Sequence, residues 1–199
     1  MTDAPYGLRP IRNMAGGNAG QRARVYRVTA TGNTHGIFVG DPIKFNALGL
    51  GISRQSSNAV PTQRMLGVAT EMWDENGRPL TFSQPTRGPF LPAGVAGWAA
   101  VVDSQMVTFI CQADASAAET MVGQYVSLTA VTQGGNTASG QSIIQIKASS
   151  ADTSVKFLQV IGISPTEQKG LGSFALNSGW GNAGIDLEVR IALHAFTCS

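Results

Sequence analysis

The chain has 199 residues and a formal net charge of +2, from 14 Lys and Arg against 12 Asp and Glu. Apolar residues make up 43% of the chain and charged residues 13%. This composition is too apolar for a disordered tail, too evenly charged for most free nucleic-acid binders and too poor in Glu, Lys and Leu for a coiled coil. It describes a neutral, glycine-rich globular chain.

The first segment, residues 1–23, shows neither helical nor strand periodicity and contains Pro5, Pro10 and the pair Gly16-Gly17. We therefore predict an extended N-terminal arm over residues 1–23 that reaches beyond the body of its own subunit. The first residues lack the basic and apolar regions of a secretory signal, and no window approaches 18 apolar residues. We expect neither a secretory signal nor a membrane span.

From residue 24 onward the chain alternates short apolar runs with Gly-, Ser- and Pro-rich loops. The predicted strands cover residues 24–30, 37–39, 43–45, 65–73, 98–103, 107–112, 125–129, 142–147, 155–163 and 185–193. Ser104 to Met106 separate two of these runs, which fits a hairpin or a kinked strand. The one helical candidate is 115–121. Long loops are expected at 46–64, 74–97 and 164–184.

The last predicted strand has the clearest pattern in the chain. Ile185, Leu187, Val189, Ile191 and Leu193 alternate with Asp186, Glu188, Arg190 and Ala192. One apolar and one wet face are typical of an antiparallel strand. No helical pattern lies between strands, which excludes βαβ units. We predict an all-β fold, an antiparallel β-sandwich or jelly-roll-like barrel with long loops, in which residues 24–199 form a single β-domain.

Motifs that carry chemistry are weak. Residues 179–184 match G-x-G-x-x-G, but a strand follows the motif instead of preceding it, so we interpret it as a glycine turn with Trp180 packed on the sheet. His35 and His194 lie far apart with no triad pattern around them. Cys111 and Cys198 lack the spacing of a zinc site; we expect free thiols, and a disulfide between them stays open. We predict no catalytic residue, cofactor or metal, and no enzyme.

The only charge asymmetry lies near the N-terminus, where Asp3 is the sole acid among five basic residues: Arg9, Arg12, Arg22, Arg24 and Arg27. This cluster fits a nucleic-acid arm, a solvated basic arm, or an arm that docks on an acidic protein surface through Arg–carboxylate pairs. We favour the third interpretation because of the resemblance that follows.

Four short islands along the chain resemble a family of tailed-bacteriophage virion proteins. They are Ala4 to Ile11 (APYGLRPI), Phe38 to Ile43 (FVGDPI), the stretch from Val101 to Asp114 that ends in FICQAD, and the stretch from Trp180 to Phe196 that ends in VRIALHAF. Their order spans nearly the whole chain. The sequence departs from the family pattern at Ser104, where a second acid is expected, and at Cys111 within a strand.

The resemblance implies a capsid decoration, or cement, protein that binds the outside of the head shell and stabilises it across capsomer seams without catalysis. The implied partners are the major capsid protein and further copies of the chain in a homotrimer, with no direct nucleic acid or membrane contact. The implied location is the virion head surface, after assembly in the host cytoplasm. Within the predicted arm, we expect four residues to contact the shell: Tyr6, Leu8, Arg9 and Arg12.

Three other functions remain open on the sequence. The chain could be another virion structural protein, of the capsid or the tail. It could be a small β-sandwich hydrolase, which needs a His or acid pair at a pocket. It could be a host- or carbohydrate-binding display module. Exposure of Trp73, Trp98 or Trp180 would support that function, although aromatic residues in or beside strands more often belong to a core.

Overall fold

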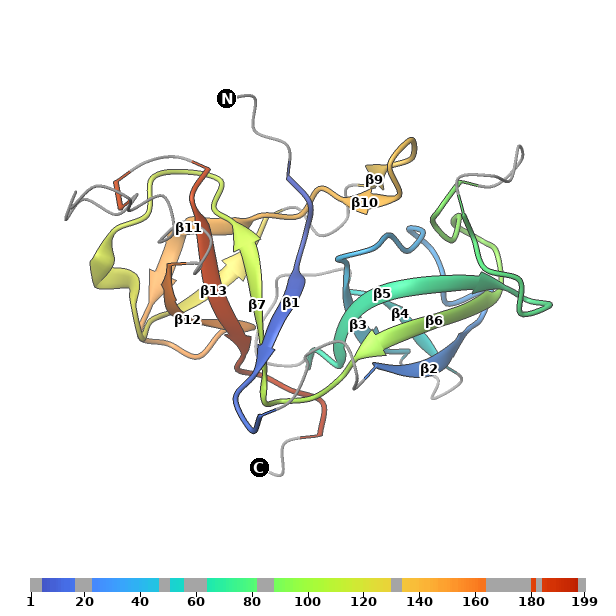
Figure 1. The fold of residues 1–199 in the computed structure, drawn as a ribbon, viewed down its shortest axis with the longest axis horizontal. Helices are drawn as coiled ribbons and strands as arrows, with labels where there is room; N and C mark the ends of the chain where they lie inside the picture. Colours follow the sequence, from blue (N-terminus) through green and yellow to red (C-terminus); the bar gives the residue numbers. More distant parts are fainter. Residues whose placement is uncertain are drawn as a thin grey trace.

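The computed structural model describes residues 5–16, 23–46, 51–55, 64–81, 88–129, 134–163, 180–181 and 184–196. These residues form two β-units that lie side by side, a six-stranded sheet and a closed five-stranded barrel (Figure 1). The one described helix is the short 3-10 turn η2 (Glu119–Met121), so the predicted all-β fold is confirmed. The described part of the chain contains no helix with the length and apolar character to cross a membrane.

The six-stranded sheet, here the sheet unit, has the order β1-β7-β13-β12-β8-β11, with antiparallel neighbours throughout. Its strands are β1 (Arg9–Asn13), β7 (Val107–Gln112), β8 (Tyr125–Leu128), β11 (Ile146–Asp152), β12 (Leu158–Ile163) and β13 (Asp186–Ile191). The predicted last strand is β13, which lies inside the sheet with Leu187 and Val189 fully buried. Its second face is not entirely wet, because Glu188 is buried as well.

The five-stranded barrel, here the barrel unit, has the order β2-β4-β3-β5-β6 and closes through β6 and β2. Its strands are β2 (Ala23–Val28), β3 (Pro42–Phe45), β4 (Ile52–Arg54), β5 (Gly67–Asp74) and β6 (Gly97–Val102). Pro42 is the first residue of β3, a position where the missing N–H of proline is tolerated. Strand β4 was not predicted from the sequence and lies in the predicted loop 46–64. A separate two-stranded ribbon joins β9 (Gly135–Asn136) to β10 (Gln141–Ser142).

The predicted N-terminal arm is wrong for residues 5–16. Residues Arg9–Asn13 form β1, which pairs with β7, and Leu8 is buried in the core of the sheet unit. Proline lowered the strand signal here, but β1 is the edge strand of the sheet, where Pro10 is tolerated. The rest of the predicted arm, 1–4 and 17–22, lies outside the described residues.

The barrel unit is inserted into the sheet unit. The chain runs from β1 into the barrel at Ala23, leaves it at Val102 and returns to the sheet at Val107, where β7 lies beside β1. Residues Asp103 to Met106 therefore connect the two units, and β6 and β7 form no hairpin with each other. The barrel has one apolar cluster, and the cluster of the sheet unit extends to Val68 and Val102 of barrel strands β5 and β6. Because β1 belongs to the sheet, the chain does not divide into an arm and a body at residue 23.

Candidate functional site

The four predicted shell-contacting residues lie on or just before β1. Leu8 is 1% exposed and packs in the sheet core, so its predicted contact with a shell is wrong. Arg9 is exposed, and its guanidinium carbon lies 4.1 Å from the centre of the Tyr6 ring, in cation–π contact. Burial and the neighbouring Asp186 carboxylate raise the pKa of Tyr6 above its ordinary value, so its phenol stays neutral at physiological pH.

Arg12 forms an ion pair within the chain. Its Nε donates to Oε1 of Glu188 at 2.7 Å, and the Glu188 side chain is only 4% exposed. A buried carboxylate without a cation is strongly unfavourable, so the first role of Arg12 is to compensate Glu188. Arg9 is therefore the one of the two predicted arginines whose charge is not already paired with a described carboxylate.

A second ion pair is buried where the barrel meets the N-terminal segment. Asp41 Oδ2 lies 3.1 Å from Arg54 Nε and accepts the backbone N–H of Phe38 at 2.9 Å. Burial raises the pKa of Asp41 to about 6, against the opposing charge of Arg54. Both side chains are almost completely inaccessible, so this pair supports the barrel and offers no surface to a ligand.

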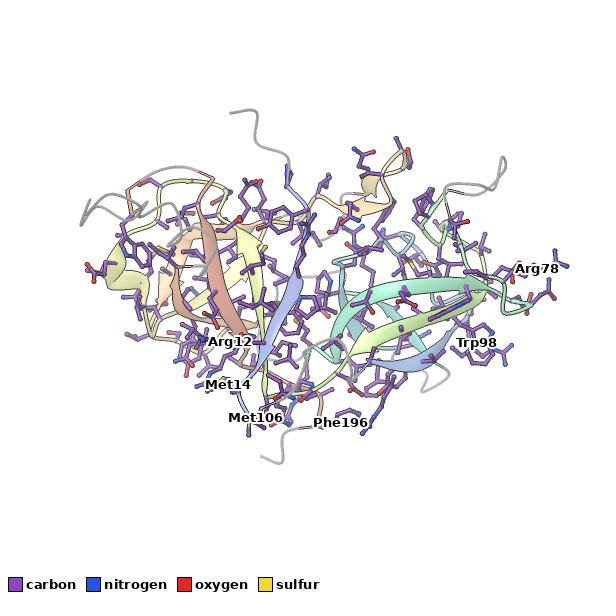
Figure 2. All side chains as sticks on the ribbon, viewed as in Figure 1. Arg12, Met14, Arg78, Trp98, Met106 and Phe196 are labelled. Atoms are coloured by element: carbon purple, nitrogen blue, oxygen red, sulfur yellow. The ribbon has the colours of Figure 1, made fainter. Side chains whose placement is uncertain are left out.

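A surface with the properties of an interface lies where the two units meet. Four large apolar side chains are each between 42% and 53% exposed there, and we call them the junction strip: Met14, Phe45, Met106 and Phe196. The backbone N–H of Met14 donates to Met106, and the rings of Phe45 and Phe196 pack edge to face at 5.7 Å. Figure 2 shows Met14, Met106 and Phe196 along one edge of the molecule.

Polar contacts fix the layer beneath the junction strip. The Tyr26 hydroxyl donates to Asp103 Oδ2 at 2.5 Å, and Arg24 Nη1 lies 3.6 Å from the same oxygen. The Tyr26 ring in turn packs against Phe45 at 6.1 Å. Asp103 is part of the connection between β6 and β7, so Tyr26 links Phe45 to the connection that carries Met106. A fixed apolar surface binds a partner with less loss of side-chain freedom than a flexible one.

The histidines and cysteine that the sequence singled out have packing roles or partial exposure. His194 is buried beside Phe196, and burial lowers its pKa, while His35 is half-buried. Cys111 is a free, buried thiol whose pKa is raised by burial and by Asp186. Among the residues that the structure describes, no three His, Cys, Asp or Glu side chains gather in a group that could hold a metal ion.

The predicted tryptophans divide between the two units. Trp180 is partly buried against the sheet core, and the N–H of Gly181, with φ of +89°, donates to the carbonyl of Ala117, as the glycine-turn interpretation requires. Trp98 is 36% exposed on the barrel, so the expectation that it belongs to a core is wrong. Trp98 and Trp73 line a shallow hollow on the barrel surface.

Comparison of the chain with protein-family models, curated proteins and solved structures finds no match. The junction strip was not found by sequence reasoning. Only Phe45 lies in a strand, β3; Met14 follows β1, Met106 lies in the connection between β6 and β7, and Phe196 follows β13. The four residues are far apart along the chain, so no local pattern groups them. Met106 gave the only local signal, as an apolar side chain in a short polar connection.

Proposed function

We propose that this chain is a capsid decoration protein of a tailed bacteriophage, which binds the outside of the head shell through the junction strip. The resemblance islands carry the family assignment, and their spatial arrangement is the observation that supports it best. Three of the islands contribute β1, β7 and β13, which are neighbours in one sheet.

The remaining island, Phe38 to Ile43, packs against the first. The N–H of Leu8 donates to the carbonyl of Gly40 at 2.9 Å, and a Cβ on Gly7 would lie 2.6 Å from the same oxygen. Gly7 has φ of +74° and Gly40 has φ of +90°, so both positions favour glycine on backbone geometry as well. The islands thus describe one structural assembly around the junction of the two units, which is what a shared fold needs.

The junction strip replaces the predicted arm as the main contact surface of this proposal. Large apolar and aromatic side chains are enriched in interface cores, whereas charged residues are depleted there. Met and Phe supply all four residues of the strip. Arg9, exposed at the start of edge strand β1, is the basic residue we assign to pairing with a shell carboxylate.

The proposed mechanism needs no chemistry. A shell filled with packed DNA fails where neighbouring capsomers separate, and a protein bound across that seam must be released before the seam opens. A contact of micromolar to nanomolar affinity contributes about 8–12 kcal/mol for each copy. In this proposal the copies associate as homotrimers, so that each assembly holds several shell subunits.

The direct test is to measure the chain in purified particles by mass spectrometry and its rebinding to particles stripped of it. We expect a fixed ratio to the major shell protein, and release of DNA at a lower temperature from stripped particles. The double variant Phe45→Ser and Phe196→Ser should lower rebinding at least ten-fold, as loss of central aromatic contacts does. Arg9→Glu should lower it less, with a stronger effect at low salt.

The matched control is Trp98→Ser, which removes an exposed aromatic of the barrel away from the strip and should leave rebinding unchanged. Melting curves of each variant separate loss of binding from loss of fold. Equal DNA release from bare and decorated particles contradicts the cement function. Full rebinding of the double Phe variant contradicts the assignment of the surface, and a monomer in sedimentation at working concentration contradicts the homotrimer.

A further inference from the structure

The outer face of the barrel carries two tryptophans side by side. Trp73 on β5 and Trp98 on β6 are register partners, and Arg27 on β2 is the partner of Trp98 on its other side. Residues directly opposite each other in neighbouring strands project from the same face of a sheet. With Val25 and Gly77, the two tryptophans line an open hollow of about 260 Å³. Figure 2 shows Trp98 and Arg78 at the end of the barrel away from the sheet unit.

One wall of the hollow is a fixed turn. Asp74 Oδ1 accepts the backbone N–H groups of Asn76 at 2.9 Å and of Arg78 at 2.8 Å. Gly77 closes the turn with φ of +77°, and a Cβ at this position would meet no atom within 4 Å. The turn therefore keeps its shape without a ligand and leaves the space above Gly77 open, which lowers the free-energy cost of ordering a bound molecule.

The elements that line the hollow also carry polar and charged residues. The exposed ones are Arg27 on β2, Glu71 on β5, and Glu75, Asn76 and Arg78 in the turn after β5. A wide apolar protein interface is depleted in charge at its centre, so these neighbouring charges disfavour one. An aromatic floor with a few polar groups around it instead fits a small ligand that has both an apolar face and polar edges.

We propose that this hollow binds a pyranose ring of glucose configuration within a glycan. In that configuration the ring hydroxyls are equatorial, so both ring faces present C–H groups and the hydroxyls lie at the edge. One C–H face would pack on the exposed indole of Trp98, and the edge hydroxyls would accept from the Arg27 and Arg78 guanidinium groups. The turn carboxylate Glu75 and the Asn76 amide provide acceptors for the remaining hydroxyl protons.

The inference does not depend on the proposed shell binding, because the hollow and the junction strip are different surfaces. The test is calorimetric titration of the full chain with cellohexaose and with chitohexaose, together with tryptophan fluorescence. We expect saturable binding of at least one of them, with a Kd of about 0.1–1 mM. Trp98→Ala should weaken that binding at least ten-fold, and Trp98→Phe should weaken it less. Because Trp98 is only 36% exposed, its truncation should lower the melting temperature, so binding is measured well below the melting transition of each variant.

Phe196→Ser is the matched control, since it alters the junction strip and should leave oligosaccharide binding intact. The pair of variants also separates the two proposals, because Trp98→Ala should retain particle binding. Absence of saturable binding with both hexasaccharides overturns the inference, as does equal binding by Trp98→Ala. A concentration-dependent dimer that Trp98→Ala abolishes overturns it too, since a second copy of the chain would then occupy the hollow.

Discussion

The sheet unit and the barrel unit differ in what they bury in their interiors. The sheet unit buries a large apolar cluster built mainly from β7, β8, β11, β12 and β13, and its buried Glu188 accepts a hydrogen bond from the exposed Arg12. The barrel has a smaller apolar cluster and contains the fully buried pair of Asp41 and Arg54.

This difference teaches where each unit is vulnerable. An apolar core fails when a polar group enters it, whereas a unit with a buried ion pair fails when one partner is removed. The barrel lies between β1 and β7 in the chain, but β1 pairs with β7 in the sheet. A substitution in β1 should therefore destabilise the sheet unit and not the barrel. Five tests probe these weaknesses in the two units, from the largest expected effect to the smallest.

Leu187→Asp tests the apolar core of the sheet unit. Leu187 is fully buried in β13, so the substitution places an unpaired carboxylate in the core and should lower the free energy of unfolding by more than about 4 kcal/mol. Urea unfolding monitored by circular dichroism measures it. Val25→Asp on the barrel surface is the control and should change stability by less than about 0.5 kcal/mol. Near-normal stability of Leu187→Asp would show that β13 is not a core strand.

Asp41→Asn tests the ion pair of the barrel. The substitution leaves the Arg54 guanidinium buried without its carboxylate, and should lower the free energy of unfolding by about 3–5 kcal/mol. Combining it with Arg54→Met removes the uncompensated charge and should recover part of the loss. If the double variant is no more stable than Asp41→Asn, the pair does not control the stability of the barrel.

Leu8→Ala distinguishes β1 from the arm predicted by the sequence. Leu8 is buried in the sheet core, and truncation of such a side chain leaves a cavity that costs about 2–5 kcal/mol. Met14→Ala, at an exposed position just after β1, should cost less than about 0.5 kcal/mol. Thermal unfolding of both variants gives the comparison. Equal melting temperatures of the two variants would contradict the burial of Leu8 and support the predicted arm for residues 5–16.

Gly67→Ala tests close backbone approach in the barrel. A Cβ at Gly67 in β5 would overlap the carbonyl oxygen of Val102 in β6, so the strands must move apart, at a cost of about 1–3 kcal/mol. Gly162→Ala in β12 meets nothing within 4 Å and should be nearly neutral. The same substitution in the two units thus separates crowding from the general effect of replacing glycine in a strand. A neutral Gly67→Ala would mean that the barrel tolerates this widening.

Alkaline pH tests the contact between Tyr26 of the barrel and Asp103 of the connection to the sheet unit. Burial and the Asp103 carboxylate raise the pKa of Tyr26 to about 12 from its ordinary value of 10. The folded state therefore keeps the phenol proton longer than the unfolded state, and this contribution is present below pH 10 and lost as pH rises to about 12. Because Tyr26 is partly solvated, we expect the loss to be at most about 1 kcal/mol. Melting at about pH 9 and about pH 11.5 measures it, with Tyr26→Phe as the variant in which this contribution disappears.

The sequence by itself determined the all-β class and the position of β13. Period-two alternation from residue 185 onward is a local signal, because each side chain on one face is buried against the same core. The glycine turn at Trp180 could also be predicted from the sequence, because the positive φ of Gly181 is a local backbone requirement that glycine meets. Short apolar runs likewise located most of the barrel strands, although not β4.

Only the tertiary structure decided which unit each strand joins. The runs on either side of Ser104 look like two halves of a hairpin, yet β6 closes the barrel and β7 pairs with β1. Leu8 and Arg12 lie in a segment whose prolines and glycines suggest an arm, yet Leu8 packs in the sheet core and Arg12 pairs with the distant Glu188. The junction strip and the hollow were not predictable for the same reason. Each combines residues from different strands and connections, and their proximity depends on long-range strand pairing, which local sequence patterns do not encode.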